Sequence, residues 1–313
     1  MKKGLLRELP LVIKLLALVT IAFFSMSFFT AISALLLQPI FGINIVQDPN
    51  ALTNYDHANT LAAFKFLQVV QAITLFIVPA LVFPWLCGEN TTDYLKARKA
   101  PTLSLVFLVL LIAYFSSPLL ELTNQVNQRM DFPDFLNRVE EWMRMKEDQM
   151  AGLTKAFLKM DTVRQLIFNL FMIAVLPAMG EELLFRGVLQ KLLIDSSRNH
   201  HAGIWIAAII FSALHFQFYG FLPRMFLGVL FGYLFYWSGN IWLPIIAHFI
   251  NNSTVVVVSY LFQHKFINFD IDKASKVSIE AYVACFAISV LLVVTFYRNT
   301  RSSTTSNYGN ELD

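Results

Sequence analysis

Long runs of apolar residues, separated by short polar turns, dominate the chain. Eight of these runs come close to or exceed the length of about 20 residues that a helix needs to cross the hydrocarbon core of a bilayer. They cover residues 15–37, 61–86, 103–120, 166–194, 202–218, 221–237, 241–262 and 279–297. The pattern predicts an all-α fold, a polytopic membrane helix bundle with about eight transmembrane helices.

One segment has a different pattern. Between residues 131 and 161, charged residues fill the spaces between apolar residues that recur mostly every three to five positions: Phe135, Val139, Trp142, Met145, Met150, Leu153, Phe157 and Met160. This spacing is typical of a helix with one apolar face. We therefore expect an amphipathic extramembrane helical segment that lies on the membrane surface or caps the bundle.

The pattern also divides the chain along its length. Residues 1–130 hold the first three transmembrane helices, 131–162 the amphipathic segment, 163–262 a core of four helices, and 263–298 the last transmembrane helix. The Ser/Thr/Asn-rich tail, 299–313, is predicted to be disordered. A Gly-x-x-x-Gly stretch at Gly228 and Gly232 predicts a helix-packing face.

Composition supports a membrane protein and excludes several other classes. The chain is 57% hydrophobic and 14% charged, whereas soluble domains average roughly 45–50% apolar and about 25% charged residues. A soluble enzyme and a disordered protein are therefore excluded. The net charge of +3 is too balanced for a nucleic-acid binder. The two cysteines, Cys87 and Cys285, lie at the end of one apolar run and inside another, which excludes a disulfide framework and argues against a Cys-based zinc site.

The distribution of basic residues predicts the orientation. They gather before the first apolar run and in the second loop, as Lys2, Lys3, Arg7, Lys96, Arg98 and Lys99. The first run is longer than the hydrophobic region of a signal peptide, so we expect an uncleaved helix. With eight spans, the positive-inside rule places both termini, the second loop and the 195–201 turn on the cytoplasmic side.

Ionisable groups inside apolar runs cost about 2.5–3.5 kcal/mol each, so they are functional candidates. Three runs carry such groups, with Glu181, Glu182 and Arg186 in the first, His215 in the second, and His248 in the third, beside the polar amides Asn251 and Asn252. Such groups can also simply hold helices together. A carboxylate pair, an arginine and two histidines on three helices exceed what helix association requires.

Depth and spacing support a shared site. Glu181 lies 18 residues before the turn at Asn199 and His215 lies 16 residues after it. At 1.5 Å per residue, both are roughly 25 Å along their helices. His248 is shallower, roughly 13 Å past the turn at Asn240.

Three pairs of these residues are four positions apart, so each pair shares a helix face: Glu182 with Arg186, Phe211 with His215, and His248 with Asn252. Glu182 can therefore pair with Arg186. Glu181 points about 100° away from Glu182.

In order, these residues match the motifs EExxxR, FxxxH and HxxxN. The chain thereby resembles the CAAX protease and bacteriocin-processing family (CPBP, or Abi) of intramembrane endopeptidases, over residues 163–262. The resemblance implies that Glu181, with His215, activates a water, that His248 and Asn252 hold the oxyanion, and that Glu182, Arg186 and Phe211 support them. It also implies a membrane-associated peptide or protein substrate in the lipid bilayer, no nucleic acid, and a bacterial inner (cytoplasmic) membrane location.

The sequence leaves other functions open. Glu181, His215 and His248 could form the His₂Glu ligand set of a zinc metalloendopeptidase. No HExxH motif accompanies them, which argues against zinc. The family resemblance favours a glutamate-type reaction without a cofactor. A non-catalytic bacteriocin-immunity or scaffold protein is the alternative from another class. A transporter is less favoured, because the chain has no internal repeat.

Overall fold

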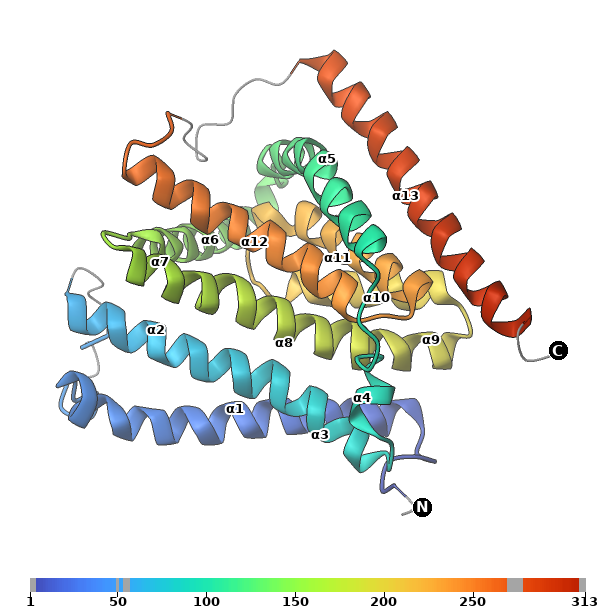
Figure 1. Cartoon of the computed structure of the whole chain (residues 1–313). Coiled ribbons are helices and arrows are strands. Elements are labelled where there is room, and N and C mark those ends of the chain that lie inside the picture. Colours follow the sequence, from blue (N-terminus) through green and yellow to red (C-terminus); the bar gives the residue numbers. More distant parts are fainter. Residues whose placement is uncertain (1–3, 49–50, 53–56, 269–277, 310–313) are drawn as a thin grey trace. The chain divides into compact units, whose positions relative to one another are not determined.

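The computed structural model of the chain describes residues 4–48, 51–52, 57–268 and 278–309. Every regular element in these ranges is a helix (Figure 1), which confirms the all-α prediction. The chain forms two compact units, each built from three separate stretches. Unit 1 holds residues 1–95, 148–189 and 252–273, and unit 2 holds residues 96–147, 190–251 and 274–313. The predicted linear division into five parts stays a prediction.

Within the described residues, seven helices are long and apolar enough to cross a membrane: Leu11–Phe41, Ala58–Leu86, Leu103–Gln128, Val163–Ser197, Phe218–Ser238, Trp242–Gln263 and Ile279–Arg301. They expose large apolar side chains such as Phe24 and Leu103, which are 69% and 87% exposed. Contiguous exposed apolar surface of this kind is typical of a membrane contact. The chain is an integral membrane protein, and seven of the eight predicted spans are confirmed.

The eighth predicted span, residues 202–218, is wrong. The corresponding helix, α10, covers His200–Ala213 and has 14 residues. This corresponds to about 21 Å, less than the hydrocarbon thickness of about 30 Å. The helix ends before Phe216, whose positive φ of 52° is incompatible with a continuing helix. His215 therefore lies in the turn after α10, and the orientation of the termini stays a prediction.

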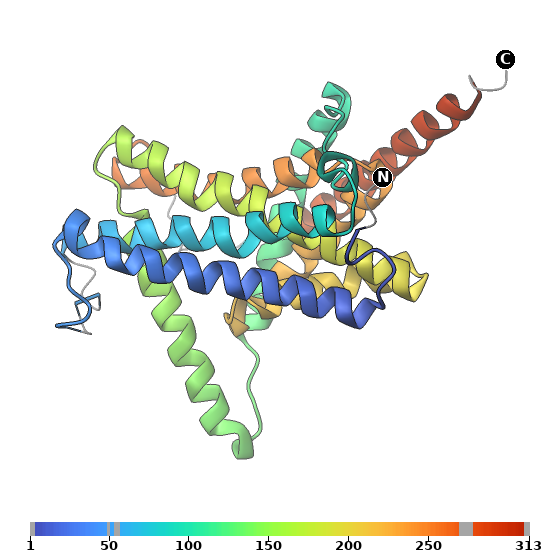
Figure 2. The same cartoon turned by 90° about the horizontal axis from the view of Figure 1, so that it is seen from below.

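Unit 1 places the helix of the first motif in a row of parallel and antiparallel helices. Its elements are α1 (Leu11–Phe41), α2 (Ala58–Ala72), η1 (Ile73–Ile77), α3 (Val78–Leu86), α4 (Thr91–Tyr94), α7 (Val163–Asn169), η3 (Leu170–Val175) and α8 (Leu176–Leu184). The rod formed by α2, η1 and α3 packs against α1 on one side and α8 on the other (Figures 1 and 2). The Ser25 hydroxyl donates a 2.6 Å hydrogen bond to the Thr74 carbonyl and ties α1 to η1.

Polar side chains fix the start of the motif-bearing rod in unit 1. Thr162 and Gln165 form a capping box at the N-terminus of α7, which satisfies two backbone N–H groups. Asn169, fully buried, accepts a 2.9 Å hydrogen bond from Lys65 and donates one of 2.6 Å to the Phe157 carbonyl. These bonds join α7 to α2 and to the amphipathic segment.

Unit 2 packs α5 (Leu103–Gln128), α9 (Lys191–Ser197), α10, η5 (Phe218–Gly220), α11 (Phe221–Ser238) and α13 (Ile279–Gly309). Its core gathers buried side chains from α5, α11, α13 and the first turns of α12, including Ile112, Phe231, Phe296 and Leu243. A Cβ at Gly228 would lie 3.0 Å from that of Ala208. The predicted Gly-x-x-x-Gly packing face is therefore confirmed, because α10 and α11 approach each other at Gly228.

The remaining helices are η2 (Asp134–Leu136), α6 (Asn137–Leu158), η4 (Phe185–Gln190) and α12 (Trp242–Gln263). Helix α6 confirms the predicted amphipathic helix. The predicted disordered tail, 299–313, is instead helical as far as Gly309, and 310–313 lie outside the described residues. A helix already formed by an apolar run extends at little cost into polar residues, because only nucleation is strongly unfavourable.

Candidate functional site

The first motif lies on α8 and η4 in unit 1 and is buried. Glu181, Glu182 and Arg186 are 8%, 0% and 1% exposed. The Arg186 guanidinium donates a hydrogen bond of 2.9 Å to Glu182, which confirms the predicted pairing. Two opposite charges in hydrogen-bond contact compensate part of the cost of burying each of them. Glu181 is the other buried carboxylate of the motif, one residue earlier on the helix.

A close helix contact accompanies Glu181. The preceding residue, Gly180, faces η1, and a Cβ there would lie 2.9 Å from the Cβ of Phe76. Any larger residue at position 180 would push η1 away from the turn that carries Glu181. The sequence analysis did not identify Gly180 as part of the site. Its only signal was its place directly before the motif.

The motif-bearing rod contains two π-helical segments. Segment η3 precedes α8 and segment η4, which carries Arg186, follows it. Single π-helical turns occur frequently at functional sites, because the wider turn changes the direction of side chains. Hydrophobic periodicity does not encode such turns, so sequence reasoning missed both.

Asn252, from the third motif, bonds within unit 1. Its side-chain amide donates a 3.1 Å hydrogen bond to the carbonyl oxygen of Ile173 on η3. Pro177 lies four residues after Ile173 and has no N–H to donate to that carbonyl. Asn252 thus satisfies a carbonyl that the proline deprives of its α-helical donor. On α12, Asn252 lies one turn after His248, as the spacing predicts.

The two motif histidines gather around one aromatic ring in unit 2. The Phe211 ring centroid lies 4.9 Å from that of His215 and 6.3 Å from that of His248, both in edge contacts. His248 also stacks on Phe231 at 5.4 Å and is 5% exposed. The predicted contact of Phe211 with His215 is confirmed, although His215 follows α10 instead of lying on it.

The backbone fixes the tautomer of His215. Its Nδ1 lies 2.8 Å from the carbonyl oxygen of Phe211. A carbonyl oxygen can only accept, so Nδ1 carries the proton and donates. In the neutral ring, Nε2 then bears the lone pair and can accept a proton. This orientation is the one that a general base requires.

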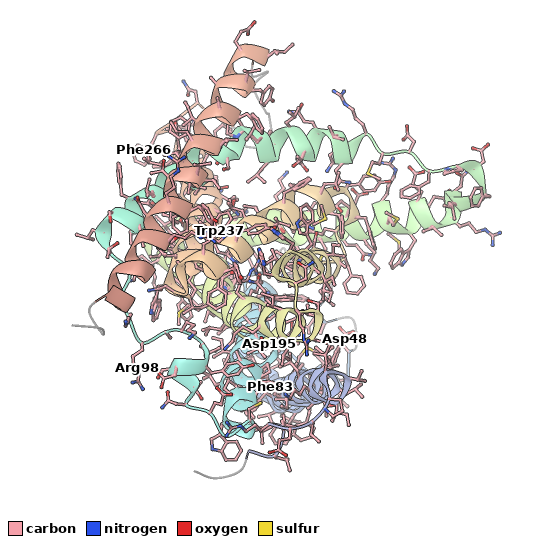
Figure 3. All side chains as sticks on the ribbon, turned by 90° about the vertical axis from the view of Figure 1, so that its right-hand side faces the viewer. Asp48, Phe83, Arg98, Asp195, Trp237 and Phe266 are labelled. Carbon is pink, nitrogen blue, oxygen red and sulfur yellow. The ribbon has the colours of Figure 1, made fainter. Side chains whose placement is uncertain are left out.

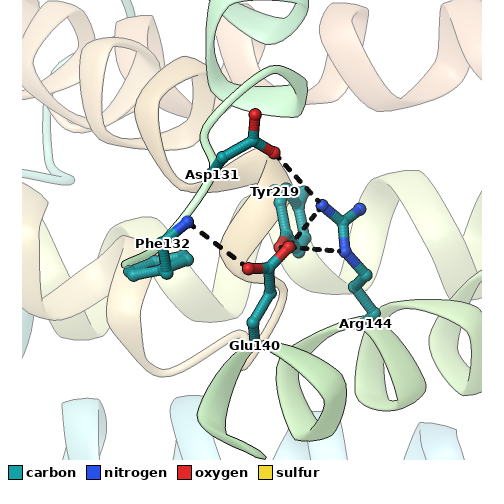
Figure 4. Close-up of polar contacts among 5 residues, drawn as sticks. All are labelled: Asp131, Phe132, Glu140, Arg144 and Tyr219. Atoms are coloured by element: carbon teal, nitrogen blue, oxygen red, sulfur yellow. Dashed lines mark hydrogen bonds and ion pairs between the residues drawn. The ribbon is translucent and has the colours of Figure 1, made fainter. Parts of the chain in front are cut away.

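A polar cluster holds the segment that follows His215 (Figure 4). On α6, Glu140 accepts hydrogen bonds from Arg144 at 2.6 and 2.9 Å, from the Tyr219 hydroxyl at 3.4 Å and from the Phe132 amide at 3.3 Å. Arg144 lies over the Tyr219 ring, 4.5 Å from its centroid. The amphipathic segment thereby anchors η5, which begins three residues after His215. Sequence reasoning located the segment but not this contact.

Metal ligation was the alternative reading of the motif residues. Among the residues that the structure describes, no three His, Cys, Asp or Glu side chains form a group that could hold a metal ion. Glu181 belongs to unit 1 and His215 and His248 to unit 2, so the zinc ligand set stays a prediction.

The seven motif residues are divided between the two units. Unit 1 holds Glu181 with the Glu182–Arg186 pair, and also Asn252 bonded to η3. Unit 2 holds Phe211, His215 and His248. Within each unit, residues far apart in the sequence are side by side. That these groups form one centre, and the role of each residue in it, stay predictions.

Comparison with known proteins supports the resemblance. The chain is 33% identical over 118 residues to a Bacillus subtilis (strain 168) protein described as the uncharacterized protein YpbD; these residues are 36% of this chain and 55% of that protein. The match thus spans about half the length of this relative. No solved structure matches the chain. The family model of type II CAAX prenyl endopeptidase Rce1-like proteins matches residues 163–254, which include all seven motif residues. Residues 163–254 are therefore similar to type II CAAX prenyl endopeptidase Rce1-like proteins.

Proposed function

We propose that the chain is an intramembrane endopeptidase, resembling CAAX prenyl proteases, that cleaves a peptide bond of a membrane-associated substrate with an activated water. The observation that carries the proposal is the buried pair of adjacent carboxylates on α8, one of them bonded to Arg186. A structural ion pair needs one carboxylate, and a second at the neighbouring position is costly in a membrane helix. A catalytic role for the second carboxylate accounts for its presence.

In this proposal Glu181 is the general base. It takes a proton from a water molecule, which attacks the scissile carbonyl carbon, and later returns the proton to the leaving amine. His215, whose ring is held by the contact of Nδ1 with the Phe211 carbonyl, orients the same water. A positioned acid–base group is typically worth about 10²–10⁴-fold in rate.

His248 and Asn252 are assigned to the oxyanion. Both lie on α12 one turn apart, so their side chains project from one face. Hydrogen-bond donors placed where negative charge develops act strongly in a site shielded from water. The contacts of His248 with Phe211 and Phe231 hold its ring in place for this role.

Glu182 and Arg186 support the site and do not react. Their ion pair is inaccessible to solvent and fixes the turn of α8 and η4 beside Glu181. We also assign the protein to a bacterial inner (cytoplasmic) membrane, in keeping with the basic residues that precede its first helix.

The test is a comparison of membrane proteomes from cells that express the wild-type chain or Glu181→Ala. The proposal expects uncleaved membrane proteins to accumulate with Glu181→Ala, and their shortened forms to appear only with the wild type. Glu280→Gln, an exposed carboxylate at the start of α13, is the matched control and should behave as wild type. Identical proteomes for all three strains would instead favour a non-catalytic scaffold or immunity protein.

A further inference from the structure

A second site lies at one end of unit 2, apart from the motif residues. A cavity of about 790 Å³ opens between the end of α11, the start of α10 and the 293–301 stretch of α13. Its polar and aromatic lining comprises His200, His201, Tyr236, Trp237, Tyr297 and Arg301. Trp237 is labelled in Figure 3. Its ring centroid lies 5.2 Å from that of Tyr297 on α13, so this contact joins the α11 wall of the cavity to the α13 wall.

The rings that line the cavity are held in place by one another. The Nδ1 atom of His201 lies 2.5 Å from the Tyr233 hydroxyl. The His200 ring stacks on Tyr236 with centroids 4.5 Å apart and planes 2° from parallel. The Arg301 guanidinium lies 4.9 Å from the Tyr297 ring centroid. The cavity is thus a built arrangement, in which little side-chain entropy remains to be lost on binding.

The surroundings of the cavity are basic. The turn after Trp237 is bonded to the second loop, which carries Lys96, Arg98 and Lys99. Asn240 donates a 2.8 Å hydrogen bond to the Lys99 carbonyl, and the Trp242 indole donates one of 2.9 Å to the Ala97 carbonyl. The same end therefore carries Lys96, Arg98, Lys99, Arg198, Arg298 and Arg301. Such an excess marks the cytoplasmic side of a membrane protein.

The charge inside the cavity comes from Arg301 and from α10. Burial, and to a smaller extent the neighbouring His201, lowers the pKa of His200, so its ring is neutral near pH 7 and serves as a hydrogen-bonding group. His200 and His201 are the first two residues of α10, and the N-terminal end of a helix favours an anion. The site thus combines one fixed cation, a helix N-terminus and imidazole groups.

The wall formed by α13 includes apolar residues and continues into the exposed apolar surface of that helix. Val293 and Val294 of α13 line the cavity. Farther along the same helix, Val290 and Leu291 are 46% and 66% exposed. A ligand can therefore place an anionic group among Arg301 and the histidines while its hydrocarbon part follows α13. On α13, Tyr297 lies between Val294 and Arg301, and amphipathic rings of this kind occur at headgroup level.

We propose that this cavity binds an anionic phospholipid of the cytoplasmic leaflet, with the phosphate headgroup against Arg301 and His200 and the acyl chains along Val293 and Val294. Anionic lipids are concentrated in that leaflet, and basic pockets between membrane helices bind their headgroups. Glu181, His215, His248 and Asn252 do not line the cavity. The proposal therefore does not depend on the proposed protease function.

The experiment measures lipid binding to the purified full-length chain in a neutral detergent, by native mass spectrometry with a parallel thermal melt. Phosphatidylglycerol, phosphatidylcholine and glycerol 3-phosphate are titrated separately. We expect saturable binding of phosphatidylglycerol, about tenfold tighter than that of phosphatidylcholine, and no competition by glycerol 3-phosphate. Equal affinity for the two lipids would overturn the proposal, as would full competition by glycerol 3-phosphate, which would indicate a site for free phosphate.

Variants locate the site. Arg301→Gln should weaken phosphatidylglycerol binding about tenfold, because it removes the charge-assisted bond to the phosphate. Arg298→Gln removes an exposed charge from the same helix outside the cavity and is the matched control that should bind normally. Val294→Trp narrows the apolar wall of the cavity while keeping every charge, and should also weaken binding. Unchanged binding in folded Arg301→Gln or in folded Val294→Trp would place the lipid elsewhere and contradict the proposal.

Discussion

The side-chain amide of Asn252 donates a hydrogen bond to the carbonyl of Ile173, four residues before Pro177. This bond links α12 to the π-helical segment that precedes the two carboxylates. Asn252 therefore has a structural partner in addition to the oxyanion role proposed for it. The two roles predict different losses when the side chain is removed.

Asn252→Ala should lose turnover far beyond its loss of stability. The Ile173 carbonyl is half-buried, so losing this donor costs at most about 1–3 kcal/mol of unfolding free energy. An oxyanion donor is worth roughly 10²–10³ in turnover. Cleavage rate and thermal melting of the same preparation measure both quantities. A variant that melts early but cleaves at the wild-type rate would leave Asn252 a purely structural residue.

The Glu182–Arg186 pair should matter for stability more than for chemistry. Removing one partner leaves a buried charge without compensation, so Arg186→Ala should cost about 3–5 kcal/mol of unfolding free energy. Replacing both partners together, as Glu182→Gln with Arg186→Met, should recover much of the loss. Melting temperature and expression level check this. Equal losses in the single and double variants would contradict the assignment.

Glu140 should hold η5 in a pH-dependent way. Its hydrogen bond with Arg144 is the largest cause that lowers the pKa of the Glu140 carboxyl below 4.5. A carboxyl with a lowered folded-state pKa stabilises the fold above its ordinary pKa, and this contribution disappears as the pH falls through the lowered value. The protection factors of the 218–220 amides, which correct for the slower intrinsic exchange in acid, should therefore fall on acidification.

The Glu140→Gln variant supplies the control for that measurement. Its exchange in the 218–220 segment should already be faster at pH 7 and should respond less to acid. Glu141→Gln, on the exposed neighbouring position, should exchange as the wild type does. If acid affects the wild type and Glu140→Gln equally, another group controls the segment.

Hydropathy predicted most of the fold because apolar length decides whether a helix can span a bilayer. It failed at α10, where Phe216 and Phe218 lengthen the apolar run although the helix has ended at Ala213. Apolar character does not reveal a backbone turn. The prediction for the tail after Arg298 was wrong in the opposite sense, because helix α13 continues into polar residues.

Motif spacing predicted the local pairs of the site but not its long-range contacts. Glu182 with Arg186 and Phe211 with His215 follow from four-residue spacing. The bond of Asn252 to Ile173 joins residues 79 positions apart. It depends on how the helices pack, as does the contact of Gly180 with η1. A single sequence carries no direct signal for either.

The choice between a glutamate and a zinc mechanism depends on metal removal. With Glu181 as the general base, the purified protein should keep its cleavage rate after stringent chelation, and its zinc content should be well below one per chain. Loss of activity on chelation, reversed specifically by added zinc, would assign Glu181, His215 and His248 as ligands.

The central claim is that Glu181, and not its neighbour Glu182, moves the proton. The most direct measurement is the single-turnover cleavage rate of a substrate identified from the proteome comparison, with wild type, Glu181→Gln and Glu182→Gln reconstituted in the same bilayer. The account predicts that Glu181→Gln binds substrate, melts like the wild type and is slower by about 10²–10⁴-fold. Glu182→Gln should melt somewhat earlier but still cleave. A stable, inactive Glu182→Gln beside an active Glu181→Gln would contradict the account.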